Sequence, residues 1–319
     1  AENGGFVTSE DLAMYRADDS RIVQGSYRGY EIIGLDFPAA GAVCIQALQT
    51  MEVFDPGHML PEDWAAVAGQ AIGIASMELG NLGSDSAAAR VTSKEWARGM
   101  VNRIRVPGGG GMKGPFTSGP SSQSSGEKHP VIPEAHFTTH ISVADGESMT
   151  VALTQTVGPI MGSKVATPGL GFHYAVTLGG YLLQSGPGTR ARSFVSPLLV
   201  QKDGKPVLVL GAAGGEKIVS SVVQVVSRVI DGGMTLSEAM AAPRVSRGFD
   251  GTLAMETSGP NGWTEGQMER VRALGLKVRA SPGPVSFALV QALQLDPTSG
   301  RWPAVSAPAG GGAAMGIRR

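Results

Sequence analysis

Two adjacent threonines and a histidine, Thr138, Thr139 and His140, stand where a stretch rich in glycine, proline and serine gives way to a β-rich sequence. A threonine hydroxyl is a weak nucleophile unless a base removes its proton. A free α-amino group on the same residue, whose ordinary pKa is about 8, can be that base. This chemistry therefore requires cleavage of the Phe137–Thr138 bond. By spacing alone, the simpler interpretation, that a strand begins here, is favoured.

The segment that precedes these residues, 107–133, carries no periodic apolar pattern. It buries too little surface to offset the entropy of ordering it, so we predict a mobile surface linker. A linker would let the two ends of a cleaved chain separate without disrupting a core. Gly109, Gly111 and Gly114 match G-x-G-x-x-G, but prolines flank them where a nucleotide site needs a strand and a helix. We exclude that function.

Other catalytic signatures are absent from the sequence: there is no G-x-S-x-G elbow, no Walker loop and no H-E-x-x-H. His136 and His140 are four residues apart, but no third ligand or acidic partner stands nearby. We therefore expect no metal and no cofactor.

The composition indicates a globular chain with a large core, since 42% of its 319 residues are apolar and 17% are charged. The net charge of −1 gives no indication of a nucleic acid or an anionic membrane as partner. The apolar runs are too short to cross a bilayer. Cys44 is the single cysteine, so no internal disulfide can form, and its apolar surroundings predict a buried structural thiol. The first residues contain no secretion signal.

Helical patterns dominate the first third of the chain. Thr8 or Ser9 can cap a helix that runs to about residue 17, and Pro61 suits a helix start. Further helices are predicted over 40–54, 61–79 and 92–104, and a single strand over 26–37 that stops at Pro38.

The pattern after the linker is β-rich. Strands are predicted over 139–145, 148–157, 173–183, 277–280 and 286–297. A hairpin over 196–211 turns at Asp203 and Gly204. Helices are predicted over 215–233 and 235–243. Paired strands with helices before and between them predict stacked sheets covered by helices.

Several segments, among them GGFVTSEDLAMYRA, TTHISVADGESMTVALTQTV and SPLLVQKDGKPVLVLGAAGGEK, resemble γ-glutamyltranspeptidase, an N-terminal-nucleophile hydrolase. The resemblance covers nearly the whole chain apart from the linker, and the motifs follow the family's order. It implies an α+β fold, the αββα four-layer sandwich. The fold would be incomplete at its N-terminal end, because the family's N-terminal portion has no counterpart here.

The same resemblance implies three regions. Residues 1–106 would be the mainly helical C-terminal part of a large-subunit-like region, 107–137 the linker before the processing site, and 138–319 the small-subunit-like region that carries the nucleophile. The chain would then be a fragment, a shortened homologue or one piece of a larger precursor. A periplasmic or secreted location is also implied by the resemblance.

The catalytic residues follow by matching motifs. The resemblance makes Thr138 the nucleophile released by self-cleavage between Phe137 and Thr138, and Thr156 a hydroxyl that supports it. Gly214 and Gly215 match the pair whose backbone amides form the oxyanion hole. Glycines let the backbone approach a tetrahedral intermediate, and the helix that follows adds its positive end. Without the resemblance, a plain strand-to-helix turn is the favoured interpretation of these glycines.

The departures from the family pattern concern substrate recognition. Gly179 and Gly180 replace the segment whose aspartate holds the glutamyl amino group, and Ser193 and Phe194 replace paired serines. The arginine that holds the α-carboxylate belongs to the absent portion, and Thr156 is followed by Val157 where an asparagine is usual. Because lost polar partners cost selectivity, we expect a non-standard and more apolar acyl group.

The sequence thus predicts a self-processing hydrolase or acyltransferase that cleaves an amide bond in a small molecule or peptide. Its two processed fragments would stay associated. The acceptor would be water or an amine. The alternative is a non-catalytic homologue that serves as a binding or assembly module.

Overall fold

The structure is a computed structural model that describes residues 8–19, 21–79, 82, 85–107, 136–176, 188, 190–248, 250–283, 287–307 and 311–316, with the backbone alone at 85, 86, 136 and 137. Residues 108–135 of the predicted linker, together with Gly179 and Gly180, lie outside the described residues. The last two residues of the predicted linker, His136 and Phe137, belong to a strand instead.

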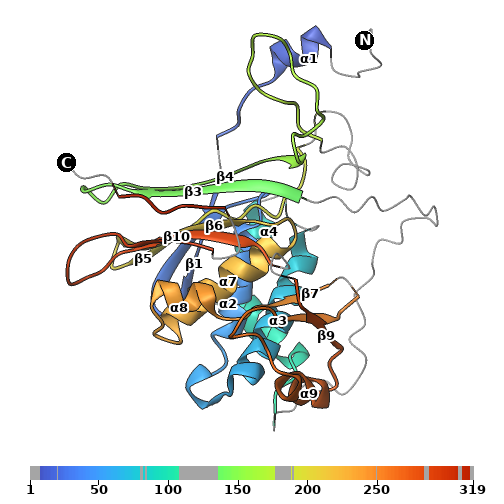
Figure 1. Cartoon of the computed structure of the whole chain (residues 1–319), viewed down its shortest axis with the longest axis vertical. Coiled ribbons are helices and arrows are strands. Elements are labelled where there is room, and N and C mark those ends of the chain that lie inside the picture. The colour runs from blue at the N-terminus through green and yellow to red at the C-terminus, as the bar shows by residue number, and fades with distance from the viewer. Residues whose placement is uncertain are drawn as a thin grey trace.

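A six-stranded antiparallel sheet forms the centre of the molecule, in the order β1-β2-β5-β6-β10-β11 (Figure 1). Its strands are β1 (Ile22–Tyr27), β2 (Tyr30–Leu35), β5 (Leu198–Lys202), β6 (Lys205–Ala213), β10 (Leu289–Gln294) and β11 (Ala304–Ser306). β2 pairs with β5, so the segments before and after the linker share one sheet.

Two tight turns set the register of this sheet. Asp203 and Gly204, with φ of 51° and 74°, join β5 to β6 and confirm the predicted hairpin. Arg28 and Gly29, with φ of 52° and 75°, make an equivalent turn between β1 and β2. The prediction of a single strand over 26–37 was therefore wrong, because this turn divides it into the arms of a hairpin.

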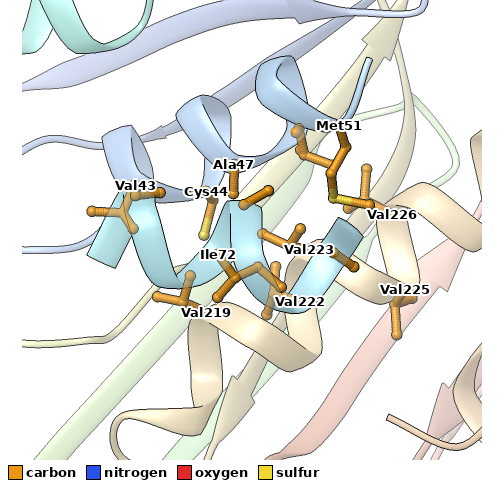
Figure 2. Packing of buried hydrophobic residues seen from close by; sticks show 14 of the residues in the cluster. Val43, Cys44, Ala47, Met51, Ile72, Val219, Val222, Val223, Val225 and Val226 are labelled. Atoms are coloured by element: carbon orange, nitrogen blue, oxygen red, sulfur yellow. The ribbon is translucent and has the colours of Figure 1, made fainter. Parts of the chain in front are cut away.

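Helices α2 (Gly41–Met51) and α7 (Lys217–Ile230) cover one face of the sheet, and α3 (Pro61–Glu78) packs against both of them. Valines at 219, 222, 223 and 226 recur every three or four residues on α7 and are fully buried. Figure 2 shows them meeting side chains of α2 and α3 in the core. Cys44 lies among them, and burial raises its pKa to about 12, as expected of a structural thiol.

The remaining elements are short. They are α1 (Ser9–Met14), α4 (Asp85–Val91), α5 (Lys94–Met100), α8 (Leu236–Ala241) and α9 (Glu265–Ala273), the 3-10 turns η1 (Pro56–His58) and η3 (Val101–Arg103), and a sheet of β7 (Val245–Arg247), β8 (Leu253–Glu256) and β9 (Val278–Ser281). Helices α4 and α9 were not predicted, nor were β7, β8 and β11. The strand predicted from His173 is wrong over 173–176, where the chain makes one isolated bridge to Ala166, and 177–183 lies outside the described residues.

A two-stranded antiparallel sheet lies on the face of the main sheet opposite the helices (Figure 1). It consists of β3 (His136–Ala144) and β4 (Thr150–Pro159), and β3 packs against β6 and β10. The described chain therefore has helices, a large sheet and a small sheet in successive layers, as the prediction of stacked sheets requires. No described helix is long and apolar enough to span a membrane.

Candidate active site

Strand β3 runs without a break through the predicted cleavage point, and its pairing with β4 is irregular there. Phe137 pairs with Gly158 while Thr138 pairs with Thr156, so Val157 is an extra residue that bulges from β4. A bulge bends a strand and changes where neighbouring side chains point, which is why bulges occur beside active sites. The strand begins at His136, which confirms the interpretation of this region as a strand start.

Thr138 and Thr156 are directly paired across the two strands. Side chains of a directly opposed pair lie on the same face of a sheet, within reach of each other. The hydroxyl of Thr156 accepts a hydrogen bond from the Gly158 amide at 3.0 Å. Its position opposite Thr138 suits the supporting role predicted for Thr156.

Gly214 and Gly215 form the turn from β6 into α7 and have φ of 149° and 59°. Side chains rarely adopt such conformations, and a Cβ on Gly214 would lie 2.6 Å from the backbone of Ala288. The two carbonyls accept from the amides of Lys217 and Ile218. Neither glycine amide donates a hydrogen bond to a described residue.

A pocket beside Thr138 brings most of the predicted site residues together. It holds about 580 Å³ of space, part of it open to solvent. Its walls are Thr138, Thr156, Gly158, Ala191, Arg192, Ser193, Phe194, Val195, Gly215 and Ile218. Gly214 adjoins this pocket through Gly215 without lining it.

The wall formed by residues 191–195 is held by backbone hydrogen bonds to the segment that leads into α2. The Ser193 amide donates to the Pro38 carbonyl at 2.8 Å, and the Ala40 amide donates to the Val195 carbonyl at 3.0 Å. The hydroxyl of Ser193 accepts from the Val195 amide at 3.2 Å. Ser193 and Phe194 therefore reach the pocket from a fixed segment, as expected for residues that bind substrate.

His140 has a position that the sequence analysis did not predict. Its ring is buried between β3 and β6, and a Cβ on Gly211 would lie 2.3 Å from it. Nδ1 contacts the Thr154 hydroxyl at 2.7 Å and Nε2 contacts the Ser142 hydroxyl at 2.9 Å. The Ser142 hydroxyl donates to the Gln291 carbonyl at 3.3 Å, so Nε2 carries the proton and Nδ1 accepts from Thr154.

These contacts link the small sheet to β10 of the main sheet, two residues from Thr138. Burial lowers the pKa of His140 to about 4, so the ring is neutral at pH 7. Among the described residues, no cluster of three or more histidine, cysteine or acidic side chains could hold a metal.

Arg192 is a charged residue of the pocket wall that the sequence analysis did not predict. Its position directly before Ser193 was the one sequence feature that could have placed Arg192 at the pocket. An arginine in a glycine-rich, polar segment, however, gives no indication of which way its side chain points.

The fold is that of the N-terminal-nucleophile hydrolases. The chain superposes over 97% of its length on 55% of the crystal structure of a cephalosporin acylase from Bacillus halodurans, with a TM-score of 0.77 and 21% identity. Likeness at that identity shows the fold alone.

The chain belongs to the γ-glutamyltranspeptidase family, whose model, described as gamma-glutamyltranspeptidase, matches residues 1–317. It is 29% identical over 303 residues to the glutathione hydrolase proenzyme of Escherichia coli strain K12, covering 87% of this chain and 50% of that protein. It is 31% identical over 300 residues to the acylase ACY 1 proenzyme of Pseudomonas sp. strain SE83, covering 88% and 50%. The predicted resemblance is confirmed, and the chain spans about half the length of these relatives.

Proposed function

We propose that this chain carries the nucleophile of a self-processing amide hydrolase or acyltransferase, and that the nucleophile is Thr138. One observation carries the proposal: Thr138, its paired hydroxyl Thr156 and the glycine turn at Gly215 line the same pocket. A nucleophile, a polar partner and backbone donors around one cavity are the parts that acyl transfer needs.

Self-processing would use the same groups. The Thr138 hydroxyl adds to the Phe137 carbonyl, the Phe137–Thr138 C–N bond breaks, and the nitrogen leaves as the α-amine of Thr138. Water then hydrolyses the ester between the Phe137 carbonyl and the Thr138 oxygen. The products are a carboxylate on Phe137 and a new N-terminus that begins Thr-Thr-His.

Turnover repeats the chemistry on a substrate. The Thr138 amine takes the hydroxyl proton while the oxygen attacks the amide carbonyl, and the same proton passes to the amine that leaves. The amides of Gly214 and Gly215, with the N-terminal end of α7, stabilise the oxyanion of the tetrahedral intermediate. Water or a second amine then resolves the acyl-enzyme.

Relatives with similar sequences are named for different activities, glutathione hydrolase and acylase. For this chain we propose an acyl specificity that differs from a standard γ-glutamyl group. The support is Phe194, which lines the pocket where the family pattern has a second serine.

Denaturing electrophoresis with N-terminal sequencing tests the proposal. The purified protein should separate into two pieces, and the smaller should begin Thr-Thr-His. A single intact band after prolonged incubation, with no turnover of any amide, would instead support the non-catalytic binding module.

A further inference from the structure

The pocket beside Thr138 contains one charge, and it is positive. Of the ten described residues that line it, Arg192 alone is ionisable, and none carries a carboxylate. The remaining walls are hydroxyls, glycines and apolar side chains, the latter including Phe194, Val195 and Ile218.

The Arg192 guanidinium has no partner within the described part of the chain. It is half-buried, yet it makes no hydrogen bond or ion pair with any described residue. Arg190, two residues earlier, contrasts with it: that side chain pairs with Asp18 at 2.6 Å and donates to the Tyr15 hydroxyl at 2.9 Å. Removing a cation from water without a counter-charge is unfavourable, so an unpaired arginine in a pocket wall is suited to an anionic ligand.

The part of the substrate that meets Arg192 follows from the reaction order. In acyl transfer the leaving amine departs and the acceptor enters, while the acyl group is bonded to Thr138 from the attack until the acyl-enzyme is resolved. We therefore assign the acyl group to the pocket that Thr138 lines. A carboxylate at its far end would reach Arg192, and Phe194, Val195 and Ile218 would surround its methylene chain.

We infer that the site selects amides whose acyl group carries a carboxylate and no ammonium group, with Arg192 as the residue that determines this specificity. The inference rests on the proposed function, because it assigns the substrate class of that same site. It also refines the expectation of an apolar acyl group: the chain would be apolar and its end anionic. A zwitterionic acyl group fits less well, because the described pocket walls offer no acid to its ammonium.

Three chromogenic anilides of equal chain length test the inference. Glutaryl-p-nitroanilide is anionic, 4-carbamoylbutanoyl-p-nitroanilide is its neutral counterpart, and γ-glutamyl-p-nitroanilide is zwitterionic. We expect kcat/KM for the glutaryl compound to exceed that for each of the others at least tenfold, as a charged hydrogen-bonded pair provides. Arg192→Gln should reduce the ratio of glutaryl to carbamoyl compound to near one, and Arg192→Lys should restore part of it.

Arg190→Gln is the matched control, since it removes the same charge from the same segment outside the pocket. It should leave the substrate ratio unchanged. A wild-type protein without preference for the glutaryl compound would overturn the inference, as would an undiminished preference in Arg192→Gln.

A binding measurement separates this inference from the proposed function. Glutaric monoamide and glutaric diamide have the same shape and differ in one charge, and calorimetry on the wild-type protein gives their affinities. Tenfold tighter binding of the monoamide, lost in Arg192→Gln, supports the anion site even if no anilide is hydrolysed. Hydrolysis without charge preference, or equal binding of the two amides, would contradict the anion site. Either result would leave the proposed hydrolase function unaffected.

Discussion

The small sheet buries its polar face and exposes its apolar face, which is the reverse of most sheets. The face that packs on the main sheet presents Thr138, His140 and Ser142, while the outward face presents apolar residues that are about half exposed. Those residues are Ile141 at 46%, Val143 at 49%, Val151 at 48% and Leu153 at 48%. An antiparallel sheet with one solvated face usually buries its apolar side. Here the buried side carries the candidate chemistry, and its hydrogen bonds take the place of apolar burial.

The inner face owes its order to polar contacts. The Thr154, His140 and Ser142 side chains form a hydrogen-bonded series that ends on the Gln291 carbonyl. Because the His140 ring is buried and its two partners are partly buried, each bond costs more to lose than an exposed one would. The inner face should therefore respond strongly to substitution and to pH, while the outer face should tolerate change.

The largest expected effect separates two neighbouring threonines. Thr138→Ala should abolish self-cleavage and lower turnover at least about 10⁴-fold, because it removes the nucleophile. Thr139→Ala alters the same motif on the outward face and should process normally. Electrophoresis and anilide assays of both variants measure this. Normal processing of Thr138→Ala would exclude Thr138 as nucleophile.

The next effect concerns the turn beside the inner face. Gly214→Ala places a Cβ 2.6 Å from Ala288 at a φ of 149°, so it should shift the oxyanion amides and lower kcat by roughly 10²–10³-fold. Gly233→Ala is the control: its φ is 59° and its Cβ would meet nothing within 4 Å. That variant should lose about 1 kcal/mol of stability and keep full activity. Equal activity in both variants would remove the oxyanion role from the turn.

A smaller effect depends on pH. The pKa of His140 is about 4 in the folded protein and 6.5 as its ordinary value, so the unfolded state binds the proton first as pH falls. Folding should lose stability between pH 6.5 and 4, by up to roughly 3 kcal/mol. Chemical denaturation at pH 7 and pH 5 measures the loss, and His140→Asn should flatten it. An identical pH slope in that variant would show that other groups cause it.

The smallest effect is expected on the outer face. Leu153→Thr should change the free energy of unfolding by less than about 0.5 kcal/mol, because the side chain is half exposed in this chain. Leu210→Ala in β6 provides the contrast, since that side chain is fully buried and should cost about 2–5 kcal/mol. Urea titrations of both compare the two layers. A large loss from Leu153→Thr would mean that the outer face is covered in solution.

Local sequence signals predicted the elements that are long or have distinctive turns. The valine spacing was sufficient to predict helix α7, and Asp203 and Gly204 were sufficient to predict the hairpin of β5 and β6, because each pattern has one low-energy backbone conformation. The β1–β2 hairpin was missed since Arg28 is an unusual residue at positive φ, and alternation continues through the turn. Short elements such as α9 and β11 carry too few residues to show a period.

In the candidate site, too, the sequence predicted some residues and missed others. The candidate catalytic residues Thr138, Thr156 and Gly215 could be named from the sequence, with the family resemblance, because they lie in contiguous motifs. The positions of His140 and Arg192 could not, because their surroundings come from distant parts of the chain. Gly211 and Gln291, which receive the His140 and Ser142 side chains, lie about 70 and 150 residues further along.

The amino-acid sequence by itself determined that β3 and β4 have one polar and one apolar face, because alternation follows from the two-residue period of a strand. Only the tertiary structure decided which face is buried. The polar face packs on the main sheet because a chain of hydrogen bonds satisfies its buried groups there, and this placement brings Thr138 to the pocket.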